Sequence, residues 1–228
     1  MLVLSPKRIT VTLSVFAFTL LLISIVRNIY QQFTGAELRV GTIFSFGDQV
    51  NVPTWYSSSL MLLCALLMLV IAWNSHNNGD RFARHWGFLS LLFVLLSANE
   101  VALLHRRLFV FFIYVLPLPG KRLIGFFLLT ACVVGLFLAY RKFLAHLPKQ
   151  ILSSFVVVGT LYFAAALIDK LDKREYWRYV ETFGVERSPG LLTTVDEMLE
   201  LIGVIILIHA VLSYMSLHIK ELRFYIKN

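Results

Sequence analysis

Long apolar runs alternate with short polar segments along the whole chain. Six runs reach or approach the roughly 20 residues that an α-helix needs to cross a bilayer. They cover residues 9–27, 57–75, 86–105, 123–140, 150–168 and 198–217. The pattern therefore predicts an all-α fold, a polytopic membrane helix bundle of about six transmembrane helices, with residues 1–228 forming one integral membrane domain.

A seventh apolar run, residues 108–118, is only about half as long as a membrane span. Arg106 and Arg107 precede it, and a Pro-Gly-Lys-Arg sequence follows it at 119–122. A run this short, bounded by charges and prolines, indicates an interfacial or re-entrant segment within residues 106–122.

The chain begins with the layout of a signal peptide, because Lys7 and Arg8 precede an apolar stretch. That stretch is long, however, and no small-residue cleavage site follows it, so we expect an uncleaved first span. With the N-terminus inside, Lys and Arg are denser in the inner connections than in the outer ones. This density predicts that both termini lie inside, although the basic pairs 106–107 and 121–122 then fall outside.

Two longer outer loops are expected, at residues 28–56 and 169–196, the second opening with a charged continuation of the fifth helix. Pro53 predicts the start of the second helix, with Thr54 or Ser57 as its N-cap. Thr194 and Glu197 have capping-box spacing and predict the start of the last helix.

Composition supports the membrane assignment and excludes other classes. The chain is 58% hydrophobic and 15% charged, with mean hydropathy +0.77, whereas soluble proteins are about 25% charged. The net charge of +8 does not indicate nucleic-acid binding, since the basic residues punctuate apolar runs. Cys64 and Cys132 lie within such runs, which favours buried packing over a disulfide or metal site.

Acidic residues are concentrated at one depth, near the outer ends of the third, fifth and sixth spans. Acids inside a membrane usually face a bundle interior or a water-filled cavity. We therefore predict an outer pocket lined by carboxylates. The candidate catalytic residues are Glu100, Asp196 and Glu200, and the candidate metal ligands are Glu100, Asp169, Asp196 and Glu200.

A structural role for the same acids is the alternative. Asp196 and Glu197 complement the positive end of a helix dipole, and Glu100 pairs with Arg106 or Arg107. A zinc site built from several histidines is disfavoured, because only His105 lies at this depth. An oxygen-rich calcium or magnesium site stays open.

His209 lies deep in the last span and is a candidate ligand for a haem iron or a pigment magnesium. The alternative is a hydrogen bond to a neighbouring helix, through a group such as Ser213 or a backbone carbonyl. The identity of any cofactor is left open.

No nucleotide-binding, metalloprotease or serine-hydrolase motif occurs in the chain. The favoured function is a non-catalytic membrane subunit that packs on a larger membrane protein complex. One alternative is a membrane-embedded enzyme acting on a lipid-linked substrate through the outer pocket, and another is a small transporter or cation-binding protein. The expected partners are the lipid bilayer and a membrane protein or a second copy, in a bacterial inner membrane.

Overall fold

The computed structural model describes residues 5–34, 43–44, 46, 51–104, 121–183 and 191–219, and their regular structure is helical. The six long helices are α1 (Pro6–Thr34), α2 (Val52–Asn77), α3 (Ala83–Ala102), α5 (Lys121–His146), α6 (Lys149–Phe183) and α7 (Leu191–His218). The predicted all-α fold is confirmed, and each predicted span falls on one helix. The predicted segment within 106–122 lies mostly outside the described residues, which resume at Lys121.

Five of these helices are long and apolar enough to cross a membrane. They are the stretches Pro6–Tyr30, Val52–Asn77, Ala83–Ala102, Lys149–Asp172 and Leu192–His218. Between them the chain must pass through the bilayer repeatedly, so the protein is a multi-pass membrane protein.

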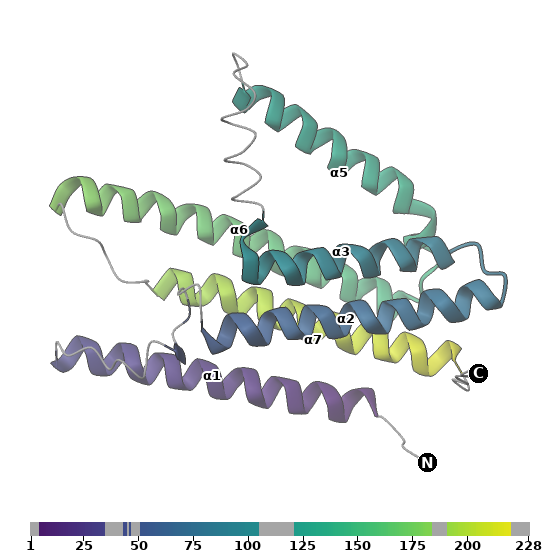
Figure 1. Cartoon of the computed structure of the whole chain (residues 1–228), viewed down its shortest axis with the longest axis horizontal. Helices are drawn as coiled ribbons and strands as arrows, with labels where there is room; N and C mark the ends of the chain where they lie inside the picture. The colour runs from purple at the N-terminus through teal and green to yellow at the C-terminus, as the bar shows by residue number, and fades with distance from the viewer. Residues whose placement is uncertain are drawn as a thin grey trace.

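Helix α7 is the centre of the bundle, because it packs against α1, α2 and α6, while α3 packs against α2 (Figure 1). Leu201, Val204, Ile208 and Val211 of α7 are almost completely buried. Helix α5 lies at the periphery (Figure 1).

The helix boundaries correct two predictions. The N-cap of α2 is Asn51, whose Oδ1 accepts a hydrogen bond from the Thr54 N–H at 2.6 Å, rather than Thr54 or Ser57. Asparagine competes well for this position, and Pro53 then occupies the first turn, where its missing N–H costs nothing. Helix α7 begins at Leu191, so Thr194 is a buried residue inside the helix and not its cap.

Two helices continue beyond the predicted spans. Helix α6 runs to Phe183, which confirms the predicted helical continuation after residue 168. Helix α1 runs to Thr34, into the stretch predicted as an outer loop. Helix α3, in contrast, ends at Ala102, where Leu103 adopts a left-handed conformation with φ 51°.

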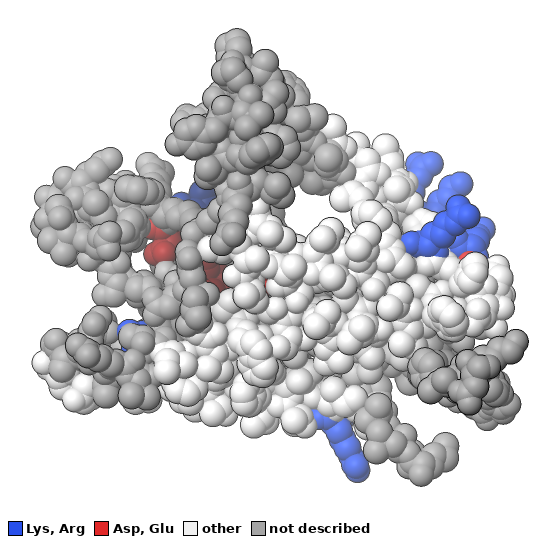
Figure 2. All heavy atoms as spheres, in the orientation of Figure 1, with Lys and Arg blue, Asp and Glu red and all other residues white. Residues whose placement is uncertain are grey.

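A cluster of exposed basic side chains lies at one end of the bundle, and most of the visible acids lie at the other, where some basic side chains are also present (Figure 2). The beginning of α1 and the end of α7 lie toward the same end of the bundle as the basic cluster (Figure 1). The turns between α2 and α3 and between α5 and α6 lie there too, and they expose the basic residues Arg81, Arg84, Arg141, Lys142 and Lys149. The acids of α3 and α7 lie at the other end.

Close packing of α6 on α7 depends on Gly203. A Cβ placed there would lie 3.0 Å from Cε2 and 3.3 Å from Cδ2 of Tyr162, whereas a Cβ at Gly159 of α6 would meet nothing within 4 Å. Small residues of this kind let membrane helices approach closely.

We therefore expect Gly203→Ala to lower the free energy of unfolding by about 1 kcal/mol or more, through overpacking. The matched control Gly159→Ala should leave stability unchanged or slightly raised, because alanine favours the helix. Thermal unfolding in detergent checks both. Equal stability of the two variants would contradict the inferred close contact.

Candidate functional site

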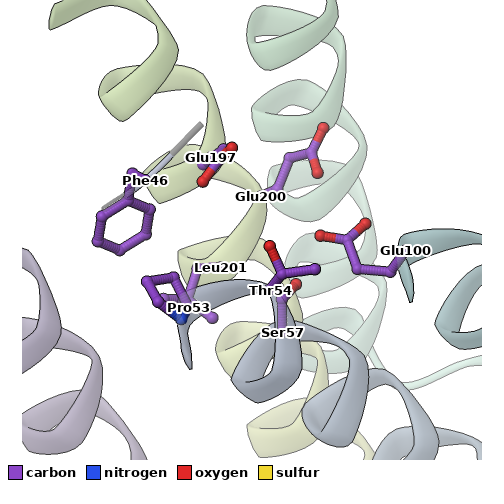
Figure 3. Close-up of a pocket in the computed structure, with 8 residues that line it drawn as sticks. All are labelled: Phe46, Pro53, Thr54, Ser57, Glu100, Glu197, Glu200 and Leu201. Carbon is purple, nitrogen blue, oxygen red and sulfur yellow. The ribbon is translucent and has the colours of Figure 1, made fainter. Parts of the chain in front are cut away.

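A small polar pocket lies at the end of the bundle away from the termini, between α2, α3 and α7 (Figure 3). Its volume is about 10 Å³, which is close to the least space that holds one water. The lining residues are Phe46, Pro53, Thr54, Ser57, Glu100, Glu197, Glu200 and Leu201.

Helix α3 brings Glu100 to the pocket, and serines hold that end of α3 against α2. Ser58 Oγ donates to the Ser97 carbonyl oxygen at 3.0 Å, and Ser97 Oγ donates to the Ser58 carbonyl oxygen at 2.9 Å. Ser90 Oγ donates to the Ala65 carbonyl oxygen, two turns further along the same interface. Since Glu100 follows Ser97 by three residues, this contact determines where Glu100 points.

Helix α7 contributes Glu197 and Glu200, which are three residues apart and therefore on one face. Leu201, the neighbour of Glu200, is 1% exposed and anchors this part of α7 in the core. Glu200 also lies near enough to Glu100 for the two carboxylates to interact electrostatically.

Hydroxyl groups and one ring complete the pocket. Thr54 and Ser57 come from the first turns of α2, which the Asn51 cap holds in place. The backbone N–H of Phe46 donates to Oγ of the fully buried Ser24 at 3.5 Å, which seats the ring of Phe46 beside α1.

The carboxylates of Glu100 and Glu200 lie on the same side of the pocket in Figure 3, with the oxygens of Thr54 and Ser57 below them. Among the described residues, neither carboxylate has a hydrogen-bonding or ion-pairing partner, and no lysine or arginine lines the pocket. Two neighbouring carboxylates repel each other, and a bound cation or a proton on one of them relieves that repulsion.

The other predicted acids form a separate group between α6 and α7. Asp196 does not line the pocket: it is 8% exposed, and its Oδ1 accepts the Glu197 N–H at 2.8 Å. It interacts electrostatically with Asp169 and Asp172 of α6, and Asp172 accepts a hydrogen bond from Thr193. The structure thus brings Glu100 and Glu200 together in the pocket, whereas Asp169 and Asp196 do not line it but still interact electrostatically with Glu200.

The described residues do not support the predicted metal site in which Glu100, Asp169, Asp196 and Glu200 would bind one ion together. Among the described residues, no three His, Cys, Asp or Glu side chains lie where they could hold one metal ion. Three carboxylates line the pocket, those of Glu100, Glu197 and Glu200, and its hydroxyl oxygens come from Thr54 and Ser57. The sequence analysis considered Thr54 and Ser57 only as helix caps and not as site residues. A hydroxyl group within an apolar run can have several packing roles, so the sequence does not single out either residue.

His209 hydrogen-bonds to a neighbouring helix, as the alternative to a ligand role predicted. Its partner, however, is not the predicted Ser213 or a backbone carbonyl. Its Nδ1 lies 2.9 Å from Thr10 Oγ1 of α1, not against Ser213. Thr10 Oγ1 donates its proton to the Pro6 carbonyl oxygen, so Nδ1 of His209 is the donor in this contact. Ser213 lies one turn along the same helix, whereas the ring of His209 points across to α1. A ligand role for His209 stays a prediction.

A family model described as Domain of unknown function (DUF8692) matches residues 10–215 of the chain. The chain belongs to this family. The match begins in the second turn of α1 and ends in the last turn of α7, so it includes all six described helices and every residue of the pocket. No curated protein and no solved structure matches the chain.

Removal of the hydroxyl in Ser58→Ala should loosen the α2–α3 contact beside the pocket. Interhelical hydrogen bonds in membranes contribute about 0.6 kcal/mol on average and about 1.7 kcal/mol at most, so we expect a loss in this range. The adjacent Ser59 is half-buried, and its hydroxyl bonds within its own helix, to the Trp55 carbonyl oxygen. Ser59→Ala is therefore the control and should change thermal stability less. A larger loss from Ser59→Ala would contradict the role of Ser58.

Proposed function

We propose that the protein is a cation-binding membrane protein, and that its site is the pocket between α2, α3 and α7. The observation that carries the proposal is the meeting of the Glu100 and Glu200 carboxylates with the hydroxyls of Thr54 and Ser57. Carboxylate and hydroxyl oxygens without a basic neighbour are the ligands of hard cations.

The size and charge of the pocket favour a divalent ion, calcium or magnesium. Glu100 and Glu200 together balance a charge of about +2, with Glu197 also lining the pocket, so a divalent cation lowers the cost of holding these negative groups at membrane depth. A cavity of about 10 Å³ admits a single small occupant and not a lipid-linked substrate, so this pocket favours ion binding over the enzyme hypothesis.

The accessory-subunit hypothesis rests on apolar surface. Large side chains are well exposed on α1 and α6, among them Phe18, Phe33 and Phe163. Lipid contact explains such a surface as well as a protein partner does. The pocket is therefore the more specific guide to function.

The orientation of the site follows from the basic residues. We assign the end with Arg81, Arg84, Arg141, Lys142 and Lys149 to the cytoplasmic side, in a bacterial inner membrane, by the positive-inside rule. The pocket then opens toward the outer side of the membrane and binds cations from that side.

Metal-dependent stabilisation tests the proposal. After treatment with EDTA, the purified protein should gain several degrees in unfolding temperature on addition of CaCl₂ or MgCl₂. An ion at 100 times its dissociation constant stabilises the folded state by about 2.7 kcal/mol. Differential scanning fluorimetry in detergent, across a concentration series, measures the effect.

Glu100→Gln and Glu200→Gln should each abolish most of that gain, because an amide supplies weaker oxygen ligation and no charge. The control is Asp172→Asn, outside the pocket, where the new amide oxygen still accepts the Thr193 hydrogen bond. It should keep the full gain. The proposal is wrong if the unmodified protein shows no gain with either ion, or if both glutamine variants respond as it does.

A further inference from the structure

A second cavity opens on the membrane-facing side of the bundle, between α3, α5 and α6. Its volume is about 240 Å³, and its walls are leucine, phenylalanine and tyrosine side chains, among them Phe88, Leu92, Phe137, Tyr140, Phe143 and Phe155. We name it the α3–α5 groove. It is distinct from the acidic pocket, which lies at the other end of α3.

The groove exists because α5 is attached to the bundle near its carboxyl end. Tyr140 donates its hydroxyl proton to the His85 carbonyl oxygen at 3.0 Å. Phe143 is 1% exposed and packs edge-on against Trp86 at 5.1 Å between ring centroids. Upstream of this attachment α5 leans away from α3 (Figure 1), and residues 134–139 are all exposed.

Hydrocarbon must fill this groove in the membrane. Its walls offer water almost no hydrogen bonds, and an empty space would lose the dispersion contacts of both helices. A partner helix is about 10 Å across, so even two turns of it occupy several hundred Å³. A hollow of about 240 Å³ does not enclose a helix, whereas a narrow, flexible chain fits inside it.

Two arginines lie at the end of the groove nearest the termini. Arg84 precedes the groove residue Phe88 by four residues on α3, and Arg141 follows the groove residue Phe137 by four on α5. Residues four apart share a helix face, so both arginines continue the groove walls toward the membrane surface. Both are exposed, and Figure 2 shows basic side chains gathered at this end.

We propose that the α3–α5 groove binds one anionic glycerophospholipid from the leaflet on the side of the termini. One acyl chain lies along the apolar walls, and the headgroup phosphate lies between Arg84 and Arg141. Guanidinium groups bind phosphate oxygens in a fixed fork geometry, and basic pockets between transmembrane helices are typical sites for anionic lipids. This proposal does not depend on the proposed cation site.

Native mass spectrometry of delipidated protein tests it, with dioleoyl phosphatidylglycerol and dioleoyl phosphatidylcholine as probes. We expect a single preferred phosphatidylglycerol adduct and weaker phosphatidylcholine binding. Arg84→Gln together with Arg141→Gln should lower phosphatidylglycerol affinity by about tenfold or more. Lys142→Gln, which removes the same charge about 100° around the helix, should not.

A second pair of variants tests whether the lipid acyl chain lies along the apolar walls of the α3–α5 groove. Leu136→Trp fills the groove from a position that is already 43% exposed, whereas Leu138→Trp adds the same bulk at an exposed site outside it. The first should weaken binding of both lipids, and the second should not. Equal affinity for the two lipids, full phosphatidylglycerol binding by the double arginine variant, or a second copy of the chain in place of lipid would overturn the proposal.

Discussion

The reciprocal hydrogen bonds between Ser58 and Ser97 are the contact on which the outer end of the bundle depends. In a bilayer, lipid tails are as apolar as the helix surfaces, so hydrophobic burial does not bring helices together. Close packing and buried polar contacts must do so instead. Ser58 and Ser97 supply such a contact between α2 and α3, and Glu100 follows it by one turn. Gly203 has the corresponding role between α6 and α7, where the absence of a side chain admits the ring of Tyr162.

These contacts explain how a chain that is mostly apolar assembles a polar site. Helix α7 touches three neighbours, and its first turns carry Glu197 and Glu200 past the end of α3. The serine contact turns Glu100 toward them, and the Asn51 cap sets the first turn of α2, with its hydroxyls, at the same level. Carboxylates and hydroxyls thus meet at one end of the bundle, while the largest visible cluster of arginines and lysines lies at the other (Figure 2).

Hydropathy alone predicted the helices well, because the thickness of a bilayer requires runs of a known length. It also predicted that Glu100 and Glu200 lie at one depth. It did not predict that Asp196, one turn before Glu200, would lie near Asp169 and Asp172 of α6 and outside the pocket lining. The lipid-facing and packed sides of such helices are both apolar, so the sequence shows the depth of a residue but not the rotation of its helix. The cap at Asn51 and the partner of His209 were missed because several equivalent polar groups stood nearby.

The most direct test of the account is whether Glu100 and Glu200 lie close to each other in the pocket. In a background with Cys64 and Cys132 replaced by alanine, the double variant Glu100→Cys, Glu200→Cys is treated in membranes with a short bifunctional thiol reagent. The account predicts an efficient cross-link within one chain, seen as a peptide joining α3 to α7 by mass spectrometry. The control pair Glu100→Cys, Phe137→Cys, with Phe137 exposed on the peripheral α5, should give none. No cross-link in the first pair, or an equal yield in the control, would contradict the placement of α3 and α7 around one site.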